Sequence, residues 1–459
     1  MRRYLRHSGW LVLVLLCLLA SLDPPPVSQN AGGATSVRRP SAPPQVEPRT
    51  TDGTIALGNL EAQIAAEERL ASHGVLTVAQ RAVMIELLAL RGQFLGRIAD
   101  YERAAVLAAQ LVRDAPTDGS ALLVRARVHT IFHRFAEALA DLVEAERLGV
   151  NHDQSAAVRA DIFQASGRYD EALAIRRQRV QARPDIGSLS AEAAVWAELG
   201  ETDTAERLFV TALQQYRDVS PFPVVWLYVQ RGQMWMWEGN LTRARELFEA
   251  ACTRLPGYTA AQGHLALVEA ALARHERTVE VFRTWMQEGH LGQRQERAAT
   301  PRGDAAAAVD RDERALALLR PLAASSDDPE YAAQLARVLT EVGQLEEAHH
   351  WRAVAATRYD ELMARYPAAF ADHAAEFWLT VGGDVQRGLE LALNNLEFRQ
   401  TPRAYELALQ AAVMTQQTAL VCRIAASLQA IDHRGPRLQA LAMRTWTACN
   451  RLSRPAEGG

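Results

Sequence analysis

The sequence contains no lysine, and every one of its 50 basic residues is an arginine. It also lacks a phosphate-binding glycine loop, a nucleophile elbow and a Cys-x-x-Cys metal pattern. These absences argue against the enzyme classes that depend on those motifs, and we expect no enzymatic activity, no catalytic residue and no cofactor. The formal charge of -4 gives no basis for nucleic-acid binding. Arginine in place of lysine, with abundant alanine and leucine, is typical of a bacterial gene of high GC content.

Cysteine is scarce, with four residues in the chain. Cys17 falls in the apolar N-terminal run, which leaves Cys252, Cys422 and Cys449 further along. Cys422 and Cys449 belong to successive predicted helices, so an oxidising compartment would permit a bond between them. The favoured interpretation is that both are small buried hydrophobic residues. An odd number of cysteines weakens any prediction of a disulfide framework.

The N-terminus has the features of an export signal. Three arginines within the first six residues precede a short apolar run from Trp10 to Leu22. This pattern predicts a signal peptide over residues 1–22, followed by a flexible Pro/Gly/Ser-rich linker over 23–53. The expected location is therefore periplasmic or secreted, with membrane contact only through an uncleaved N-terminal segment. An inner-membrane-anchored assembly factor is the alternative.

A short pattern recurs along the chain, in which an aromatic residue or leucine precedes an alanine by three positions. Three of these alanines, Ala104, Ala138 and Ala172, are 34 residues apart. A period of this length is the signature of an array of stacked helices. The clearest pairs are Tyr101 and Ala104, Phe135 and Ala138, Tyr169 and Ala172, Leu241 and Ala244, and Leu345 and Ala348.

A glycine lies five residues before several of these alanines, at Gly167, Gly200, Gly239 and Gly343. Glycine takes the left-handed conformation after a helix without strain, so each glycine predicts a helix end. The order of glycine, aromatic residue, alanine and a later proline resembles the tetratricopeptide repeat (TPR) family. Residues 167–174, 239–248 and 343–348 match that family's second-helix signature. The resemblance implies an all-α fold, a right-handed superhelical solenoid of stacked antiparallel helix pairs, that acts as a non-catalytic protein-interaction scaffold.

Repeat spacing divides the chain into two predicted subarrays. An N-terminal subarray with a capping helix is expected over 54–288, and a C-terminal subarray with a capping helix over 329–452. Residues 289–328 are expected to be an irregular segment or a degenerate repeat, because Pro301 and Gly303 oppose a regular helix there. Residues 453–459 are expected to be a disordered tail.

The TPR frame places several polar and aromatic residues on the concave groove, where a peptide or protein partner would bind. Trp226 and Trp237 are candidate anchors for such a partner, although packing against the loop at 220–223 explains them equally well. Arg97 and Arg127 come from successive repeats and would resemble a carboxylate clamp. The predicted partner-binding residues are Arg97, Arg127, Trp226, Gln233, Trp237, Arg337, His373 and Phe377.

A second hypothesis concerns metal binding. Asp372, His373 and Glu376 share one helical face, and Glu346, Glu347, His349 and His350 on the preceding unit could supply further ligands. A metal-binding protein or metal-dependent enzyme using residues 346–376 is therefore the alternative to the scaffold. Such residues are also ordinary for solvated helix faces, and we expect no metal.

Overall fold

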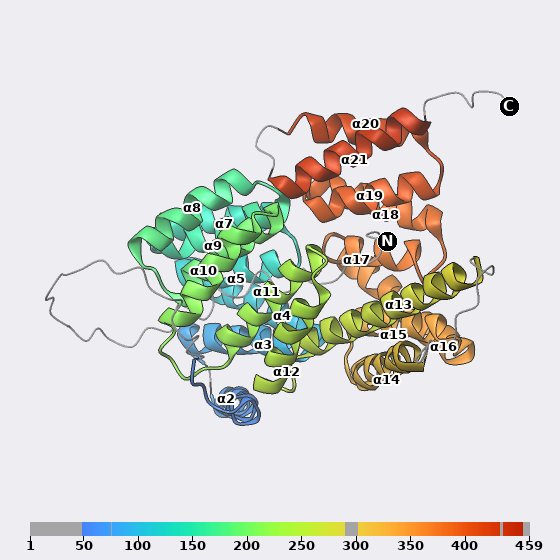
Figure 1. Ribbon diagram of the computed structural model, residues 1–459. Helices are drawn as coiled ribbons and strands as arrows, with labels where there is room; N and C mark the ends of the chain where they lie inside the picture. Colours follow the sequence, from blue (N-terminus) through green and yellow to red (C-terminus); the bar gives the residue numbers. More distant parts are fainter. Residues whose placement is uncertain (1–47, 75, 290–301, 432–434, 453–459) are drawn as a thin grey trace, which may run out of the picture.

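The computed structural model describes residues 48–74, 76–289, 302–431 and 435–452, and every regular element within these ranges is an α-helix (Figure 1). No helix among the described residues is long and apolar enough to span a membrane. The helices are α2 (Gly53–His73), α3 (Val78–Leu95), α4 (Ile98–Asp114), α5 (Gly119–Ile131), α6 (Phe135–Arg147), α7 (His152–Ser166), α8 (Tyr169–Ala182), α9 (Ile186–Leu199), α10 (Thr202–Gln215), α11 (Phe222–Trp237), α12 (Leu241–Arg254), α13 (Thr259–Gly289), α14 (Arg302–Ser325), α15 (Pro329–Glu341), α16 (Leu345–Arg365), α17 (Pro367–Leu379), α18 (Val385–Phe398), α19 (Pro402–Met414), α20 (Thr418–Gln429) and α21 (Pro436–Leu452).

Consecutive helices pack in pairs, from α3 with α4 through α19 with α20, and each pair packs on the next. This arrangement confirms the predicted all-α solenoid of stacked helix pairs. The four glycines expected to end helices have φ between 80° and 87°, the left-handed conformation that favours glycine (Gly167, Gly200, Gly239 and Gly343). The local sequence therefore sets where each of these pairs turns.

The two helices of a pair differ in how much of their surface is covered. In α11, every residue from Phe222 to Met234 is buried. Its partner α12 buries only Ala244, Leu247, Phe248 and Ala251, which form a single stripe. The first helices thus form an inner layer that is covered on most sides, and the second helices form an outer layer with one solvated face.

Residues 259–325 depart from the predicted repeat pattern. The N-terminal subarray was expected to end at residue 288, followed by an irregular segment or a degenerate repeat over 289–328. Instead, α13 is 31 residues long and pairs with the 24-residue α14. The reason is visible in the sequence around His275, where no glycine is available to end the first helix, so it continues. Residues 302–325 of the segment that was expected to be irregular or a degenerate repeat form helix α14.

The second half of the array packs along the first half. Turns near residues 96–99, 133, 165–167 and 199–200 meet turns near 326–327, 368, 399–400 and 435–437, and we call this line of contacts the seam. Figure 1 shows its course, with the red α21 beside the green helices that include α9. The backbone N–H of Gln400 donates to the carbonyl of Ser166 at 3.1 Å, and Nδ1 of His133 lies 3.0 Å from the carbonyl oxygen of Ala368. The apolar core follows this arrangement, since one cluster combines residues of α7 and α9 with residues of α17 to α21.

One end of the seam is fixed by two neighbouring aspartates. Asp328 caps its own helix α15 by accepting from the backbone N–H of Glu330 at 2.9 Å, as its position before Pro329 predicts. Asp327 instead caps α4, because it accepts from the N–H groups of Ile98 and Ala99 at 2.7 and 2.8 Å. The side chain of Arg97, the N-cap residue of α4 itself, makes no such bond. One short sequence thus begins two helices that are far apart in the chain.

Candidate functional site

The inner layer contains most of the residues that the sequence placed on a groove. Because the inner helices are packed on most sides, these side chains do not line an open channel. Arg97 keeps a side chain 48% exposed, and Trp237 and Arg337 are partly exposed. The buried members of the predicted set are Arg127, Trp226, Gln233, His373 and Phe377. Partner binding by these eight residues stays a prediction, and five of them would need the array to open first.

The two predicted tryptophan anchors have partners within the chain. Trp226 is 1% exposed and belongs to the largest apolar cluster, together with Phe222 at the start of the same helix α11. Trp237 is covered by the guanidinium of Arg437, which lies 4.5 Å from the ring centroid. This cation–π contact joins α11 to the start of α21. The geometry therefore favours the packing interpretation for Trp226 and gives Trp237 a contact within the chain.

The predicted carboxylate clamp is already paired internally. Arg127 donates to Glu86 at 2.6 Å, and Arg97 lies 3.6 Å from Glu61. Each arginine therefore holds a carboxylate of its own chain. A peptide carboxylate would have to compete with these intramolecular partners.

A charged cluster lies in the interior beside the seam. We call it the inner charged cluster, and its members are Glu330, Asp372, His373, Glu376, Arg399 and Arg403, all at least nine-tenths buried except Glu330. Arg399 donates to Asp372 at 3.1 Å and also to the carbonyl of Ala165 across the seam at 3.1 Å. Arg403 donates to Glu376 at 3.0 Å. Three acids thus face two arginines and a histidine, which balances their charges within a buried space.

The partners of each group decide the direction of its pKa shift. Burial opposes ionisation of Asp372, but the charges of His373, Arg399 and Arg403 outweigh it and hold the pKa of Asp372 well below its ordinary value. For Glu376, burial dominates over the charge of Arg403 and raises the pKa to about 7. Burial would lower the pKa of His373, but Asp372 and Glu330 outweigh it and raise that pKa.

The metal hypothesis has no support in this arrangement. Asp372 and Glu376 are bound by arginines, because Arg399 donates to Asp372 and Arg403 donates to Glu376. Glu347 pairs with Arg320 at 2.8 Å on the outer surface. Within the described ranges, no group of three or more His, Cys, Asp or Glu residues could hold a metal ion. The possible metal ligands at 346–350 therefore lie on the outer surface, whereas the acids at 372–376 are buried in the interior.

Part of that proposed ligand set lines a surface depression instead. It lies at the turn between α15 and α16, and we call it the α15–α16 notch. Leu345 is 53% exposed at its wall, and the carboxylates of Glu346 and Glu347 flank it. The lining residues are Gly343, Gln344, Leu345, Glu346, Glu347 and His350.

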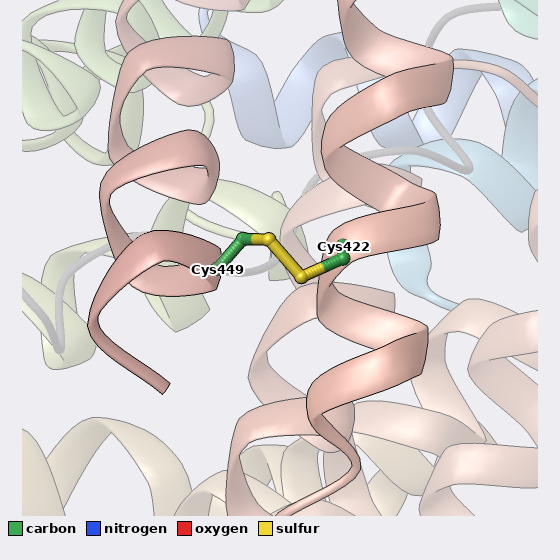
Figure 2. Close-up of a disulfide and its surroundings, with 2 residues drawn as sticks. All are labelled: Cys422 and Cys449. Carbon is green, nitrogen blue, oxygen red and sulfur yellow. A yellow bond between two sulfur atoms is a disulfide. The ribbon is translucent and has the colours of Figure 1, made fainter. Parts of the chain in front are cut away.

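Helices α20 and α21 are joined by a disulfide between Cys422 and Cys449, with Cα atoms 5.0 Å apart (Figure 2). The favoured expectation, that both are merely small buried hydrophobic residues, is wrong, because the packing of consecutive helices brings the two side chains together. Cys252 is a free and partly buried thiol. The sequence signal for the bond was the position of both cysteines on successive helices.

Helix pairs with turn glycines, buried alanines at the crossing points and an inner and outer layer extend from α3 to α20. The chain has a TPR-like fold. The buried alanines Ala104, Ala138 and Ala172, predicted from the period, are each fully covered where two helices of a pair cross. This agreement confirms the resemblance as far as the fold is concerned.

No family model and no curated protein matches this TPR-like chain. Similar solved structures include a human IFIT1 dimer with m7Gppp-AAAA, which is 11% identical and matches with 86% of this chain and 95% of that chain covered (TM-score 0.31). A tetratricopeptide repeat protein from Parabacteroides merdae is 14% identical, with 61% and 92% covered (TM-score 0.33). The Naa15/Naa10 structure bound to HypK-THB is 15% identical, with 88% and 68% covered (TM-score 0.25). Structural similarity at these TM-scores is too low to support an assignment, so the fold assignment depends on this chain's own helix pairs.

Proposed function

We propose that this chain is an exported, non-catalytic scaffold that binds a protein or peptide partner on the outer surface and turns of its helix array. The observation that carries the proposal is the array itself, because stacked helix pairs present an extended surface on a rigid frame. The inner charged cluster supports the outer location, since its acids and arginines already satisfy one another. The formal charge of -4 supports a protein partner over nucleic acid.

The α15–α16 notch is the surface that we propose for this contact. Leu345 offers an apolar wall, and Glu346 and His350 place polar groups at its edge. A small depression with an apolar wall and a polar rim suits a single anchoring side chain of a partner. Glu347 is paired with Arg320, so the carboxylate of Glu346 is the group that favours a partner segment carrying arginine or lysine near an apolar residue.

Export is proposed from the predicted signal peptide, which lies outside the described residues. The bond between Cys422 and Cys449 supports it, because disulfides persist in oxidising compartments. N-terminal sequencing of the protein purified from its native envelope tests this part. A mature chain that starts within the first residues after the apolar run is expected, whereas an intact N-terminus would favour the anchored alternative.

Affinity capture from the native cell envelope tests the scaffold proposal. The mature protein is compared with Leu345→Ala/Glu346→Arg in the notch and with Val143→Glu, a control at an exposed apolar residue of α6. A partner that is retained by the control and lost by the notch variant is expected. A third variant, Trp237→Ala, tests the predicted groove, and a partner lost only in this variant would place the site there. If the normal protein captures no partner, the scaffold proposal is contradicted.

A further inference from the structure

The last helix of the array carries an uncovered apolar stripe. Helix α21 buries Leu438, Leu441, Ala442 and Thr445 against the body of the protein. On its opposite side, Met443 is 65% exposed and Trp446 is 51% exposed. Figure 1 shows α20 and α21 together at one end of the molecule. A tryptophan and a methionine exposed together on one helix face form an apolar surface of the kind that a partner covers.

The composition of this stripe restricts what can cover it. Its exposed face comprises Gln439, Ala440, Met443, Trp446, Thr447 and Asn450, which carry no charge, and the exposed Arg444 lies at the edge of this face. The neighbouring Arg444 already lies 3.8 Å from Glu406 of α19. A second copy of the same stripe can therefore approach without placing like charges opposite each other. We propose that α21 forms a symmetric dimer with α21 of a second copy of this chain.

The spacing of the stripe is self-complementary. When two copies pack antiparallel with a two-fold axis at Met443, each residue faces the one equally far on the other side of 443. Trp446 then lies opposite Ala440 of the second copy, so a large side chain meets a small one twice. Thr447 lies opposite Gln439 in the same register, which pairs polar with polar. No other occupant is needed to explain why an alanine and a tryptophan flank the methionine at equal distances.

The size of the contact sets the expected affinity. The stripe from Gln439 to Asn450 spans about 16 Å of helix at 1.5 Å per residue. A single helix pair of this length buries less than the roughly 800 Å² per partner of a standard interface. We therefore expect a dimer that forms and dissociates with concentration, in the micromolar range.

Sedimentation velocity of the mature, disulfide-intact protein across about 1 to 200 µM tests the proposal, a range that brackets micromolar association. A shift from monomer to dimer is expected for the normal protein. Met443→Glu places two carboxylates on the axis and is expected to weaken the dimer by at least about tenfold. Val143→Glu, on an equally exposed apolar residue of α6, is expected to leave it unchanged. A protein that stays monomeric throughout, or a dimer that Met443→Glu does not weaken, would overturn the proposal.

Cysteine crosslinking tests the register independently of affinity. With Cys252→Ala as background, Met443→Cys is expected to form a disulfide with itself across the axis. Ala440→Cys and Trp446→Cys are each expected to stay uncrosslinked alone and to bond to each other when the two proteins are mixed. Crosslinking of Ala440→Cys with itself, or equal crosslinking of a Val143→Cys control, would contradict the antiparallel register.

Discussion

At the scale of single residues, glycines with the same backbone conformation differ in what surrounds them. Gly167 and Gly239 both have left-handed φ angles, of 87° and 80°. A Cβ added at Gly239 would meet nothing within 4 Å, whereas at Gly167 it would lie 2.4 Å from the carbonyl oxygen of Gln400 across the seam. The sequence predicted the helix-ending role of both glycines, but it could not reveal that one of them also permits contact with a turn more than 200 residues away.

This difference gives a matched pair of variants. Gly239→Ala is expected to lower the free energy of unfolding by about 1–2 kcal/mol, the cost of a left-handed alanine. Gly167→Ala is expected to cost about 1–3 kcal/mol more, because the seam must also shift to relieve the overlap. Urea unfolding measures both. Equal losses in the two variants would mean that the turn at 167 does not meet the turn at 400.

Asp327 offers a second test at this scale. Its carboxylate accepts from the N–H groups of Ile98 and Ala99, so Asp327→Ala removes the cap of α4 and is expected to cost about 1 kcal/mol of stability. Hydrogen exchange is expected to accelerate at Ile98 and Ala99, far away in the sequence. Exchange that changes only around residues 326–330 would contradict the contact.

The start of α15 follows from its local sequence, because Asp328 caps the helix and Pro329 occupies its first position. Nothing local shows that Asp327 serves another helix, because the acceptor and the donors are 229 and 228 residues apart. Arg399 and Arg403 were likewise missed. An arginine in a helical sequence is most often solvated, and only the tertiary fold reveals that these two neutralise buried acids.

At the scale of elements, a turn glycine explains where the predicted helix ends agree with the structure. The absence of such a glycine explains why α13 is longer than a repeat helix. Helix boundaries followed the sequence where Gly167 or Gly343 ended a helix. Around His275 no residue favours the left-handed turn, so α13 continues to Gly289 without a boundary there. The regular period could be predicted from the sequence. A place where the helix-ending glycine is absent was harder to interpret than a place where it is present.

The disulfide between α20 and α21 gives a prediction at this scale. The bond joins residues 27 positions apart, and a loop of this size is expected to contribute roughly 3–4 kcal/mol. Adding a reducing agent should therefore lower the thermal midpoint of the normal protein and of Cys252→Ala. It should leave Cys422→Ala/Cys449→Ala unchanged. A midpoint that ignores the reducing agent in all three proteins would show that the bond does not form.

The inner charged cluster predicts a pH dependence. The pKa of Glu376 is raised from 4.5 to about 7 in the folded protein, mainly by burial and against the charge of Arg403. The folded chain therefore holds a proton that the unfolded chain releases, so the contribution of Glu376 to the free energy of unfolding should fall as pH rises from about 4.5 to 7. This fall amounts to at most about 3 kcal/mol. Burial lowers the pKa of His133 to about 3 and that of His264 to about 4, and these groups contribute the opposite slope.

Urea unfolding at a series of pH values tests this sign. Glu376→Gln is expected to remove the contribution of Glu376, so that stability falls less, or rises more, with pH than in the normal protein. Glu198 and Asp328, whose pKa values burial raises to about 8 and about 6, keep their contributions in both proteins. Glu390→Gln, on the exposed face of α18, is the control and should keep the slope of the normal protein. A slope that Glu376→Gln leaves unchanged from that of the normal protein would contradict the assignment.

At the scale of the whole molecule, the sequence predicted the stacked helix pairs but not how tightly the array winds. Nearest-neighbour packing follows from the repeat pattern, because each unit carries the same glycine and alanine positions. The seam depends on small changes of angle added over many pairs, and no local motif encodes that sum. This is why the predicted open groove and the structure differ.

The seam is the central claim of this account, and a crosslink across it is the most direct test. Arg365 at the end of α16 pairs with Glu102 of α4, 263 residues earlier in the chain. With Cys252→Ala as background, Glu102→Cys/Arg365→Cys is predicted to react with a short bifunctional thiol reagent in the folded protein and not in urea. Glu102→Cys/Asp360→Cys, which uses an exposed residue on another face of α16, is predicted to react much less. Absence of the 102–365 crosslink, or equal yields from both pairs, would show that the two halves of the array do not meet.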